Sequence, residues 1–268
     1  MSKQAALLGV DVGTSSVKAA LLDLESGSGI AAGAAPLTLH SESPLQAEQD
    51  PASWWSASVS AIRACLAAAP GVEVRGVGLT GQKHALVAAD AMGQPLHRAL
   101  LWADGRAIRQ TEHVRQVFPA AGRRMGFAPH PGLFVPKWLY FAEHEPALAA
   151  QTQRLYYAKD FVRQALTGVW ATDRTEASAS QIYDFRRDRW SPTLASFFDL
   201  STDVLAPVHA SSEITAEVSR SAAELTGLPA GIPVVAGAGD NEASALACGA
   251  VGEGRVAITL GTSGTAVG

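Results

Sequence analysis

Apolar residues form two short runs near the start of the chain, with small polar residues between them. Residues 7–12 and 17–23 are rich in aliphatic and β-branched side chains, and Gly13-Thr14-Ser15-Ser16 separates them. Two such runs around a Gly/Thr/Ser turn are typical of a β-hairpin. A turn at 25–29 and the following stretch, 30–40, predict a third antiparallel strand, although Ala and Gly weaken its strand pattern.

The next segment has the pattern of a half-buried helix. Asp50 suits the N-cap and Pro51 suits the first helical position, while Pro70-Gly71 ends the segment. Apolar residues recur between them at roughly helical period, which predicts one buried face. Two of them are adjacent tryptophans, so we expect one to face the core and the other a cleft. The apolar positions are Trp54, Trp55, Val59, Ile62, Leu66 and Ala69.

Strand and helix patterns alternate through the rest of the chain, which predicts an α/β fold. A hairpin is expected from the two apolar stretches that flank the turn at 90–95. The expected strands cover residues 72–79, 85–89, 96–102, 233–236 and 256–260, and the expected helices begin at Pro136, Lys159, Ser191, Ser219 and Asn241.

Composition narrows the class of protein. The 268 residues are 47% hydrophobic and 17% charged, with a net charge of −4, which excludes a disordered chain. Without a basic cluster, nucleic acid is not an expected partner. Cys65 and Cys248 give no disulfide framework, and no histidine spacing suggests zinc. No apolar run is long enough for a signal sequence or a membrane span, so a cytoplasmic location is expected.

Two similar turns are candidates for phosphate binding. Gly13-Thr14-Ser15 follows the first strand, and Gly261-Thr262-Ser263-Gly264 follows the last. Backbone N–H groups and hydroxyls of such turns can contact phosphate, and Asp11 at the strand end could hold Mg²⁺ through water. The alternative is an ordinary hairpin turn with local hydrogen bonds.

Asp240 is the candidate general base. It follows a strand and three small residues and precedes a helix, and Gly237 and Gly239 would let a substrate hydroxyl approach. The helix dipole favours its ionised form, and it could accept a proton late in phosphoryl transfer. The alternative is a helix N-cap that bonds only its own backbone.

Polar residues at strand ends resemble a polyol-binding rim, because amide, imidazole and carboxylate groups bind sugar hydroxyls with fixed geometry. The alternative is solvated loop polarity with a weak Asp104–Arg106 surface pair. The rim residues are Gln82, Lys83, His84, Asp104 and Arg106.

Taken together, these motifs resemble the FGGY carbohydrate kinases, which belong to the actin/hexokinase/heat-shock ATPase superfold. The resemblance covers the whole chain and rests on seven motifs in the family's order. Within the family, the Gly-Gln-x-His and Trp-x-Asp-Gly-Arg motifs look most like those of xylulose kinases. The motifs begin at Gly9, Glu48, Gly81, Leu101, Lys159, Gly237 and Leu260.

The resemblance implies a ribonuclease-H-like mixed sheet flanked by helices, and transfer of the ATP γ-phosphate to a ketose, D-xylulose above all. By position, Asp240 matches the catalytic base and Asp11 the Mg²⁺ aspartate. The sugar-contacting stretches match Gln82, Lys83, His84, Asp104 and Asn241. The phosphate-contacting stretches match Gly13, Thr14, Ser15, Lys18, Gly261, Thr262 and Ser263.

Two residues depart from the family's pattern. Lys83 stands where xylulose kinases usually have Met, and Glu242 stands where a small residue is usual. A cation in the sugar rim leaves open another ketose, a polyol or a carboxylated sugar. A carboxylate beside Asp240 is expected to raise the pKa of Asp240 if it points inward.

The end of the chain bears on activity. Family members continue past the Leu-Gly-Thr-Ser-Gly motif into a second domain, whereas this chain stops at Gly268. We therefore expect a sugar-binding domain over 1–240 and the start of a nucleotide domain over 241–268. Residues 256–268 are expected to be disordered or to pack on a neighbouring chain, which makes a homodimer conceivable. This chain alone is therefore expected to be inactive as a kinase, and a sugar-binding module without turnover is the alternative function.

Overall fold

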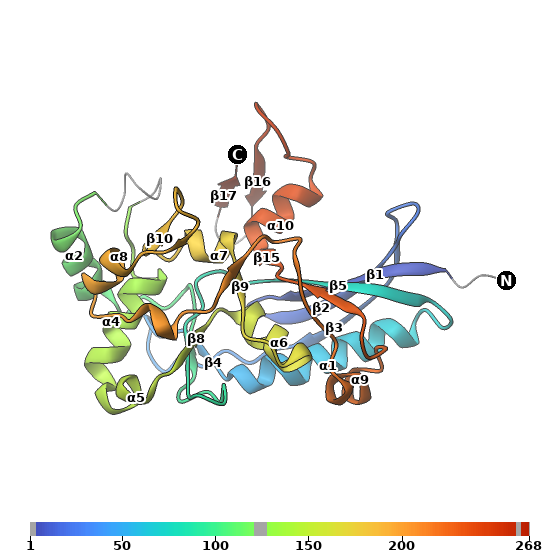
Figure 1. Ribbon diagram of the computed structural model, residues 1–268, viewed down its shortest axis with the longest axis horizontal. Helices are drawn as coiled ribbons and strands as arrows, with labels where there is room; N and C mark the ends of the chain where they lie inside the picture. The colour runs from blue at the N-terminus through green and yellow to red at the C-terminus, as the bar shows by residue number, and fades with distance from the viewer. Residues whose placement is uncertain (1–3, 121–127, 261–263, 268) are drawn as a thin grey trace.

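A computed structural model of the chain describes residues 4–120, 128–260 and 264–267 (Figure 1). Its centre is a seven-stranded sheet, in which six strands follow the order β13-β14-β5-β1-β2-β3. The seventh strand, β15, pairs with β5 closer to the C-terminal end of β5 than β14 does. The strands are β1 (Ala5–Val12), β2 (Ser16–Asp23), β3 (Gly29–Pro36), β5 (Glu73–Gly81), β13 (Ile214–Glu217), β14 (Pro233–Val235) and β15 (Ala238–Gly239).

The sheet is mixed. Strands β1, β2 and β3 form the expected antiparallel meander, while β5 is parallel to β1, and β14 and β15 are parallel to β5. The third strand ends at Pro36 rather than at residue 40. Its glycine has a structural purpose, because a Cβ at Gly33 would lie 2.3 Å from the carbonyl oxygen of Ala61. The small residues that weaken the strand pattern thus let the first helix pack closely on β3.

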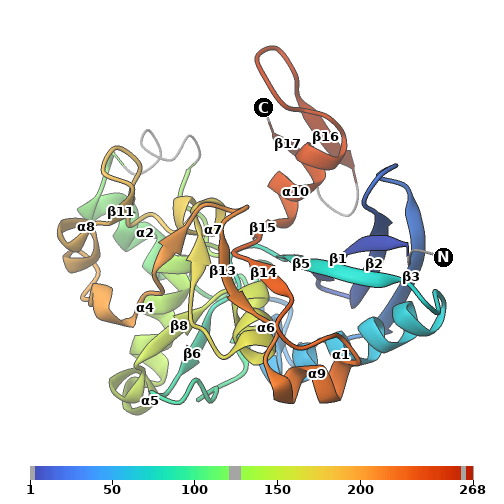
Figure 2. The same cartoon turned by 45° about the vertical axis from the view of Figure 1, so that its right-hand side comes forward.

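Three helices cover one face of the sheet: α1 (Pro51–Ala67), α6 (Ala158–Thr167) and α9 (Arg220–Thr226). Figure 2 shows them on one side of the sheet and α10 (Asp240–Ala247) on the other. Strand β1 alternates accordingly: Leu8 is buried under α1, whereas Leu7 is 43% exposed on the opposite face. As expected, Asp50 caps α1, accepting from the Ala52 N–H at 2.9 Å. One face of the sheet is therefore closed by helices and the other is left accessible.

A second core is formed by buried residues between Leu86 and Leu205 in the sequence. It is built on large apolar side chains such as Phe134, Trp138, Phe141 and Phe198. Its elements are β4 (Glu48–Gln49), β6 (Val87–Ala89), β7 (Ala99–Leu100), β8 (Arg154–Tyr156), α2 (Ile108–Val117), α4 (Phe134–His144), α5 (Pro146–Gln151) and α8 (Pro192–Ser196).

The expected hairpin over 85–102 is only partly formed. Strand β6 pairs with β8 and β7 pairs with β4, so the main partners lie outside the hairpin. The two stretches meet only at single bridges, Leu86 to Leu100 and Ala89 to Pro95. Partners about 50 to 70 residues away thus replaced the local pairing that the turn suggested.

Short elements complete the described chain. Ser191 and Ser219 cap α8 and α9 as expected. No helix in the described ranges is long and apolar enough to cross a membrane. The remaining elements are β9 (Thr172–Asp173), α7 (Arg174–Ser178), β10 (Tyr183–Asp184), β11 (Arg189–Trp190), a 3₁₀ turn (Thr202–Val204), β12 (Val208–His209), β16 (Ala257–Leu260) and β17 (Gly264–Val267).

Residues 257–260 and 264–267 form a paired hairpin and not a disordered tail, while the other expectation, packing on a neighbouring chain, stays a prediction. Strands β16 and β17 pair antiparallel and stand beside α10, away from the body of the protein (Figure 1). The strand expected over 256–260 is therefore present.

Candidate active site

Three parallel strands bring two carboxylates to the same edge of the sheet. Asp11 is opposite Thr80 in the register of β1 and β5, and Ala238 is opposite the same Thr80 in the register of β15 and β5. Since β15 leads directly into α10, Asp240 lies just beyond this edge. Burial is the main cause of the raised pKa of Asp240, and the nearby charge of Asp11 adds to it.

Asp240 is the first residue of α10, and Gly239 occupies the N-cap position. One carboxylate oxygen of Asp240 accepts from the Asn241 N–H at 2.9 Å. Burial, with Asp11 and Glu242 adding to it, raises the pKa of Asp240 to about 6. The N-cap alternative therefore holds only in part, and the raised pKa gives this carboxylate the proton affinity of a base that works near neutral pH.

Asp11 has one carboxylate oxygen without a hydrogen-bond partner among the described residues. This oxygen, Oδ1, is buried. Burial raises the pKa of Asp11, and Lys18, opposite it on β2, partly offsets this. Residues 4–120, 128–260 and 264–267 contain no cluster of three acidic, His or Cys side chains around one point. A Mg²⁺ ion held by one or two carboxylates, with water and substrate phosphates as its other ligands, fits this donor set.

A hollow of about 720 Å³ lies over the accessible face of the sheet, between the sheet and α10. Apolar side chains dominate its lining, and Asp11, Lys18 and Glu242 are among its polar residues. The hollow gives a ligand access to Asp11 from the face opposite α1.

Two buried glutamines, Gln49 and Gln82, hold the Gly13–Thr14 turn by hydrogen bonds. The Gln82 amide accepts from the Thr14 hydroxyl at 3.2 Å and donates to the Gln49 side chain at 3.0 Å. Gln49 donates to the Thr14 carbonyl at 2.7 Å and accepts from the indole of Trp54 at 2.9 Å. Gln82, expected in the sugar rim, thus supports the phosphate-type turn. Sequence reasoning gave Gln49 no role of its own, although it lies in the motif that begins at Glu48.

The tryptophan pair divides as expected. Trp54 is fully buried, whereas Trp55 is partly exposed and lines a pocket of about 510 Å³. That pocket contains neither Asp11 nor Asp240, so Trp55 is not a platform at this site.

The two residues that depart from the family's pattern form an ion pair with each other. The Lys83 ammonium lies 2.6 Å from a Glu242 carboxylate oxygen, with side-chain exposures of 9% and 32%. The charge of Lys83 lowers the pKa of Asp240, and that of Glu242 raises it. The ion pair therefore connects Lys83, next to β5, with Glu242 on α10. Because the two charges are opposite, their effects on the pKa of Asp240 nearly cancel.

His84 presents a neutral imidazole. Its backbone has φ of +65°, in the left-handed region, and its Nδ1 is buried without a described hydrogen-bond partner. Burial, and then the charges of Lys137 and Lys83, hold its pKa well below the ordinary value. Lys137 is fully buried and donates to the carbonyls of His84, Leu100 and Leu101. This lysine, which the sequence did not single out, fixes the backbone on which His84 sits.

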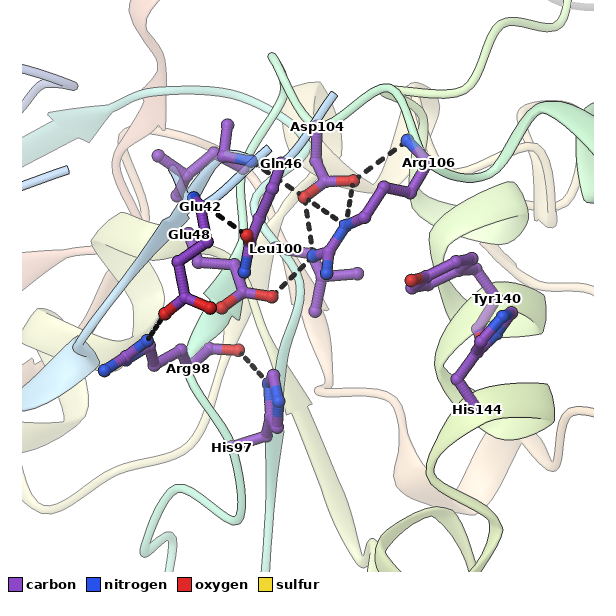
Figure 3. Close-up of polar contacts among 12 residues, drawn as sticks. Glu42, Gln46, Glu48, His97, Arg98, Leu100, Asp104, Arg106, Tyr140 and His144 are labelled. Atoms are coloured by element: carbon purple, nitrogen blue, oxygen red, sulfur yellow. Dashed lines mark hydrogen bonds and ion pairs between the residues drawn. The ribbon is translucent and has the colours of Figure 1, made fainter. Parts of the chain in front are cut away.

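Asp104 and Arg106 are not a weak surface pair. Figure 3 shows the guanidinium of Arg106 between Asp104 and Glu48, and beside the ring of Tyr140 on α4. Its closest nitrogen–oxygen distances are 2.7 Å to Asp104 and 2.5 Å to Glu48, and both carboxylates are almost fully buried. Asp104 also accepts from the Ala47 N–H at 3.0 Å. The carboxylate expected to contact sugar is thus occupied in joining β4 to the rim.

The remaining candidates divide by what the structure describes. Ser15 and Lys18 are exposed at the ends of β1 and β2, and Asn241 follows Asp240 in α10. Gly261, Thr262 and Ser263 lie outside the described residues, so the second phosphate motif is not placed.

Known proteins resemble this chain in sequence and in fold. The chain is 35% identical over 257 residues to a xylulose kinase from Escherichia coli K12, covering 96% of this chain and 53% of that protein. Its structure matches a xyloylose kinase from Brucella ovis and a xylulose kinase from Rhodospirillum rubrum, with TM-scores of 0.92 and identities of 33% and 30%. Each covers 97% of this chain and 54% of the neighbour.

These neighbours have the ribonuclease-H-like fold that the motifs implied, and the mixed sheet confirms it here. The chain spans about half the length of the relatives it matches. Residues 6–247 match the family described as the FGGY family of carbohydrate kinases, N-terminal domain. The chain belongs to the FGGY family of carbohydrate kinases and contains its N-terminal domain.

Proposed function

We propose that this chain carries the sugar site and catalytic base of an ATP-dependent kinase that phosphorylates a ketose, D-xylulose first. The observation that carries the proposal is Asp240, with a pKa raised to about 6, at a sheet edge that it shares with Asp11. A phosphate-type turn supported by buried glutamines lies at the same edge. The kinases named for xylulose among the similar proteins agree with this substrate.

In the proposed reaction, Asp240 accepts the proton of the sugar hydroxyl as that oxygen attacks the γ-phosphorus. A base with a pKa of about 6 is mostly ionised at pH 7 and can still take a proton as the nucleophile's charge develops. Backbone N–H groups of residues 13–15 would face the phosphates. Asp11, with Asp240 near it, would hold Mg²⁺, which neutralises phosphate charge when bound. Lys18 adds a positive charge beside Asp11.

The rim favours an uncharged acceptor. Lys83 would attract a carboxylated sugar if its ammonium were free, but Glu242 already pairs with it at 2.6 Å. The neutral His84, with an unpartnered buried Nδ1, suits a sugar hydroxyl, since an imidazole without charge can donate at one nitrogen and accept at the other. We therefore infer a neutral ketose in preference to a sugar acid. Asn241 would contact the sugar from α10.

Residues 1–240 are the proposed sugar-binding part, and 241–268 the proposed start of the nucleotide part. The exposed apolar side chains of Leu246, Val256 and Ile258 at α10 and the final hairpin support an association surface there, and a homodimer is one form of it. Sedimentation velocity over a range of concentrations tests the homodimer.

Calorimetry with this chain tests the sugar site: D-xylulose should bind, and D-gluconate should bind at least about tenfold more weakly. Phosphoryl transfer is measured with the protein that the gene's complete open reading frame encodes (the product of the natural reading frame). This protein is supplied with Mg-ATP and a panel of ketoses and polyols. Binding without transfer in that product would favour the sugar-binding module. Tighter binding of gluconate would refute the neutral acceptor.

A further inference from the structure

The short turn that leads into Asp240 is held at both ends by side chains from other elements. The ammonium of Lys159, on α6, donates to the Ala236 carbonyl at 3.2 Å, just before the turn. The hydroxyl of Thr175, on α7, accepts from the Gly239 N–H at 2.8 Å, one residue before Asp240. Figure 2 shows α7 beside β15 at the base of α10.

One buried carboxylate joins these two contacts. Asp173 accepts from both the backbone N–H and the hydroxyl of Thr175, at 2.7 Å and 2.6 Å, and lies 2.8 Å from the Lys159 ammonium. Lys159 and Asp173 are both 0% exposed. A threonine hydroxyl has one proton, and here it goes to Asp173, so the oxygen is left to accept from Gly239. Asp173 thus sets the direction of the hydroxyl that holds the turn.

The turn itself has little with which to fix its own shape. Gly237 has φ of +86° and lies so close to β5 that a Cβ would be 2.3 Å from the Leu79 carbonyl oxygen. A Cβ at Gly239 would be 2.7 Å from the Lys83 side chain. Glycine is required at position 237, and a side chain at position 239 would have to displace Lys83. Glycine also leaves the backbone with the most conformational freedom to lose. The order of this segment must therefore come from its neighbours.

We propose that Thr175 and Lys159, joined by Asp173, are positioning residues that hold the Gly237–Gly239 turn and thereby aim the Asp240 carboxylate at the substrate hydroxyl. The proposal rests on Asp240 being the base. It assigns a role in the reaction to residues that act through the turn, because a displacement of about 1 Å at a reacting group can cost a factor of about 100 in rate.

The variant that isolates the contact is Thr175→Val, which keeps the side-chain shape and removes the hydroxyl. Thr175→Ser should restore it. Ser211→Ala is the matched control, since the Ser211 hydroxyl donates to the same Asp173 oxygen at 3.1 Å, while the bond from the Gly237 N–H to the Ser211 backbone carbonyl at 3.0 Å stays in place. All three are compared with the unmodified chain by urea unfolding, so that a general loss of stability is seen separately.

Two measurements on this chain need no turnover. Hydrogen exchange of the Gly239 amide should become about tenfold faster in Thr175→Val, the effect of losing one hydrogen bond of ordinary strength. The pKa of Asp240, followed by ¹³C NMR of its carboxyl carbon, should fall by about 0.5–1 toward its ordinary value, because a looser turn admits water. Thr175→Ser and Ser211→Ala should leave both near their original values.

Unchanged exchange and titration in Thr175→Val would overturn the proposal, as would an equal change in Ser211→Ala. In the product of the natural reading frame, Thr175→Val should lower kcat by about tenfold or more with KM for the sugar within threefold. Loss of transfer in Asp240→Asn tests the base itself. If transfer persists there, the proposed function fails, whatever Thr175→Val does to the turn.

Discussion

Replacing the proposed base should stabilise the protein. Burial raises the pKa of Asp240 from 3.8 to about 6, so the folded protein keeps this proton at pH values where the unfolded chain has released it. The stability contributed by Asp240 is complete below pH 3.8 and is lost as the pH rises to about 6. A tenfold change in proton affinity corresponds to about 1.4 kcal/mol, which makes the loss roughly 3 kcal/mol, reduced somewhat by the partial exposure of the carboxyl. Asp240→Asn avoids it.

The assay is urea unfolding of the unmodified chain and of Asp240→Asn at intervals from pH 4 to pH 8. The difference in unfolding free energy should grow in favour of the variant between pH 4 and pH 6 and then stay level at about 2–3 kcal/mol. Glu224→Gln, at an exposed position of α9, is the control and should show no such growth. A difference that does not change with pH, or a variant less stable than the parent at pH 7.5, would refute the burial of an ionised carboxylate at this site.

Two further substitutions test the rim. Lys83→Met removes the charge that lowers the pKa of Asp240, so the pKa of Asp240, read by carboxyl ¹³C titration, should rise by about 0.5–1. Adding Glu242→Gln should lower that pKa again. A titration of Asp240 that neither change affects would contradict the role of the Lys83–Glu242 ion pair. Arg106→Lys replaces a guanidinium that bonds both oxygens of Asp104 with a single ammonium. The substitution should lower the free energy of unfolding, measured in urea, by about 2–4 kcal/mol. A decrease below about 0.5 kcal/mol would mean that Asp104 and Arg106 form only a weak surface pair.

The sequence was most informative where parallel strands end. Asp11 and Asp240 are more than 200 residues apart, yet both lie where a short apolar strand gives way to small residues, Asp11 just before them and Asp240 just after them. Because the carboxyl ends of parallel strands lie at one edge, such signals converge on one site. The caps of α1, α8 and α9 were predicted for a similar reason: an N-cap side chain bonds the backbone within three residues of itself.

Contacts between distant segments were not predictable in the same way. Glu48 is 58 residues from Arg106, and nothing in the local pattern around either shows that a buried ion pair joins them. The same holds for Thr175 and Gly239, 64 residues apart. The 85–102 segment shows the reverse error, since a good turn signal suggested a local pairing that β4 and β8 replaced. Register and burial are properties of the assembled chain, and short-range patterns do not contain them.

Lys83 and Glu242 were only partly predictable from the sequence. Each was singled out alone, because each departs from the pattern of xylulose kinases, and the sequence left open whether either faces the sugar. The structure gives both a common explanation, since one charge compensates the other across 2.6 Å. Sequence reasoning identified the two anomalies but not the contact that joins them.

The most direct test of the account is phosphoryl transfer from Mg-ATP to D-xylulose by the product of the natural reading frame, with and without Asp240→Asn, alongside calorimetric binding of the sugar. The account predicts a fall in kcat of at least about 100-fold in the variant, the usual contribution of a general base, with the Kd for D-xylulose within a few-fold. Turnover in Asp240→Asn within tenfold of the parent would contradict it, and Asp240 would then be only the first residue of its helix.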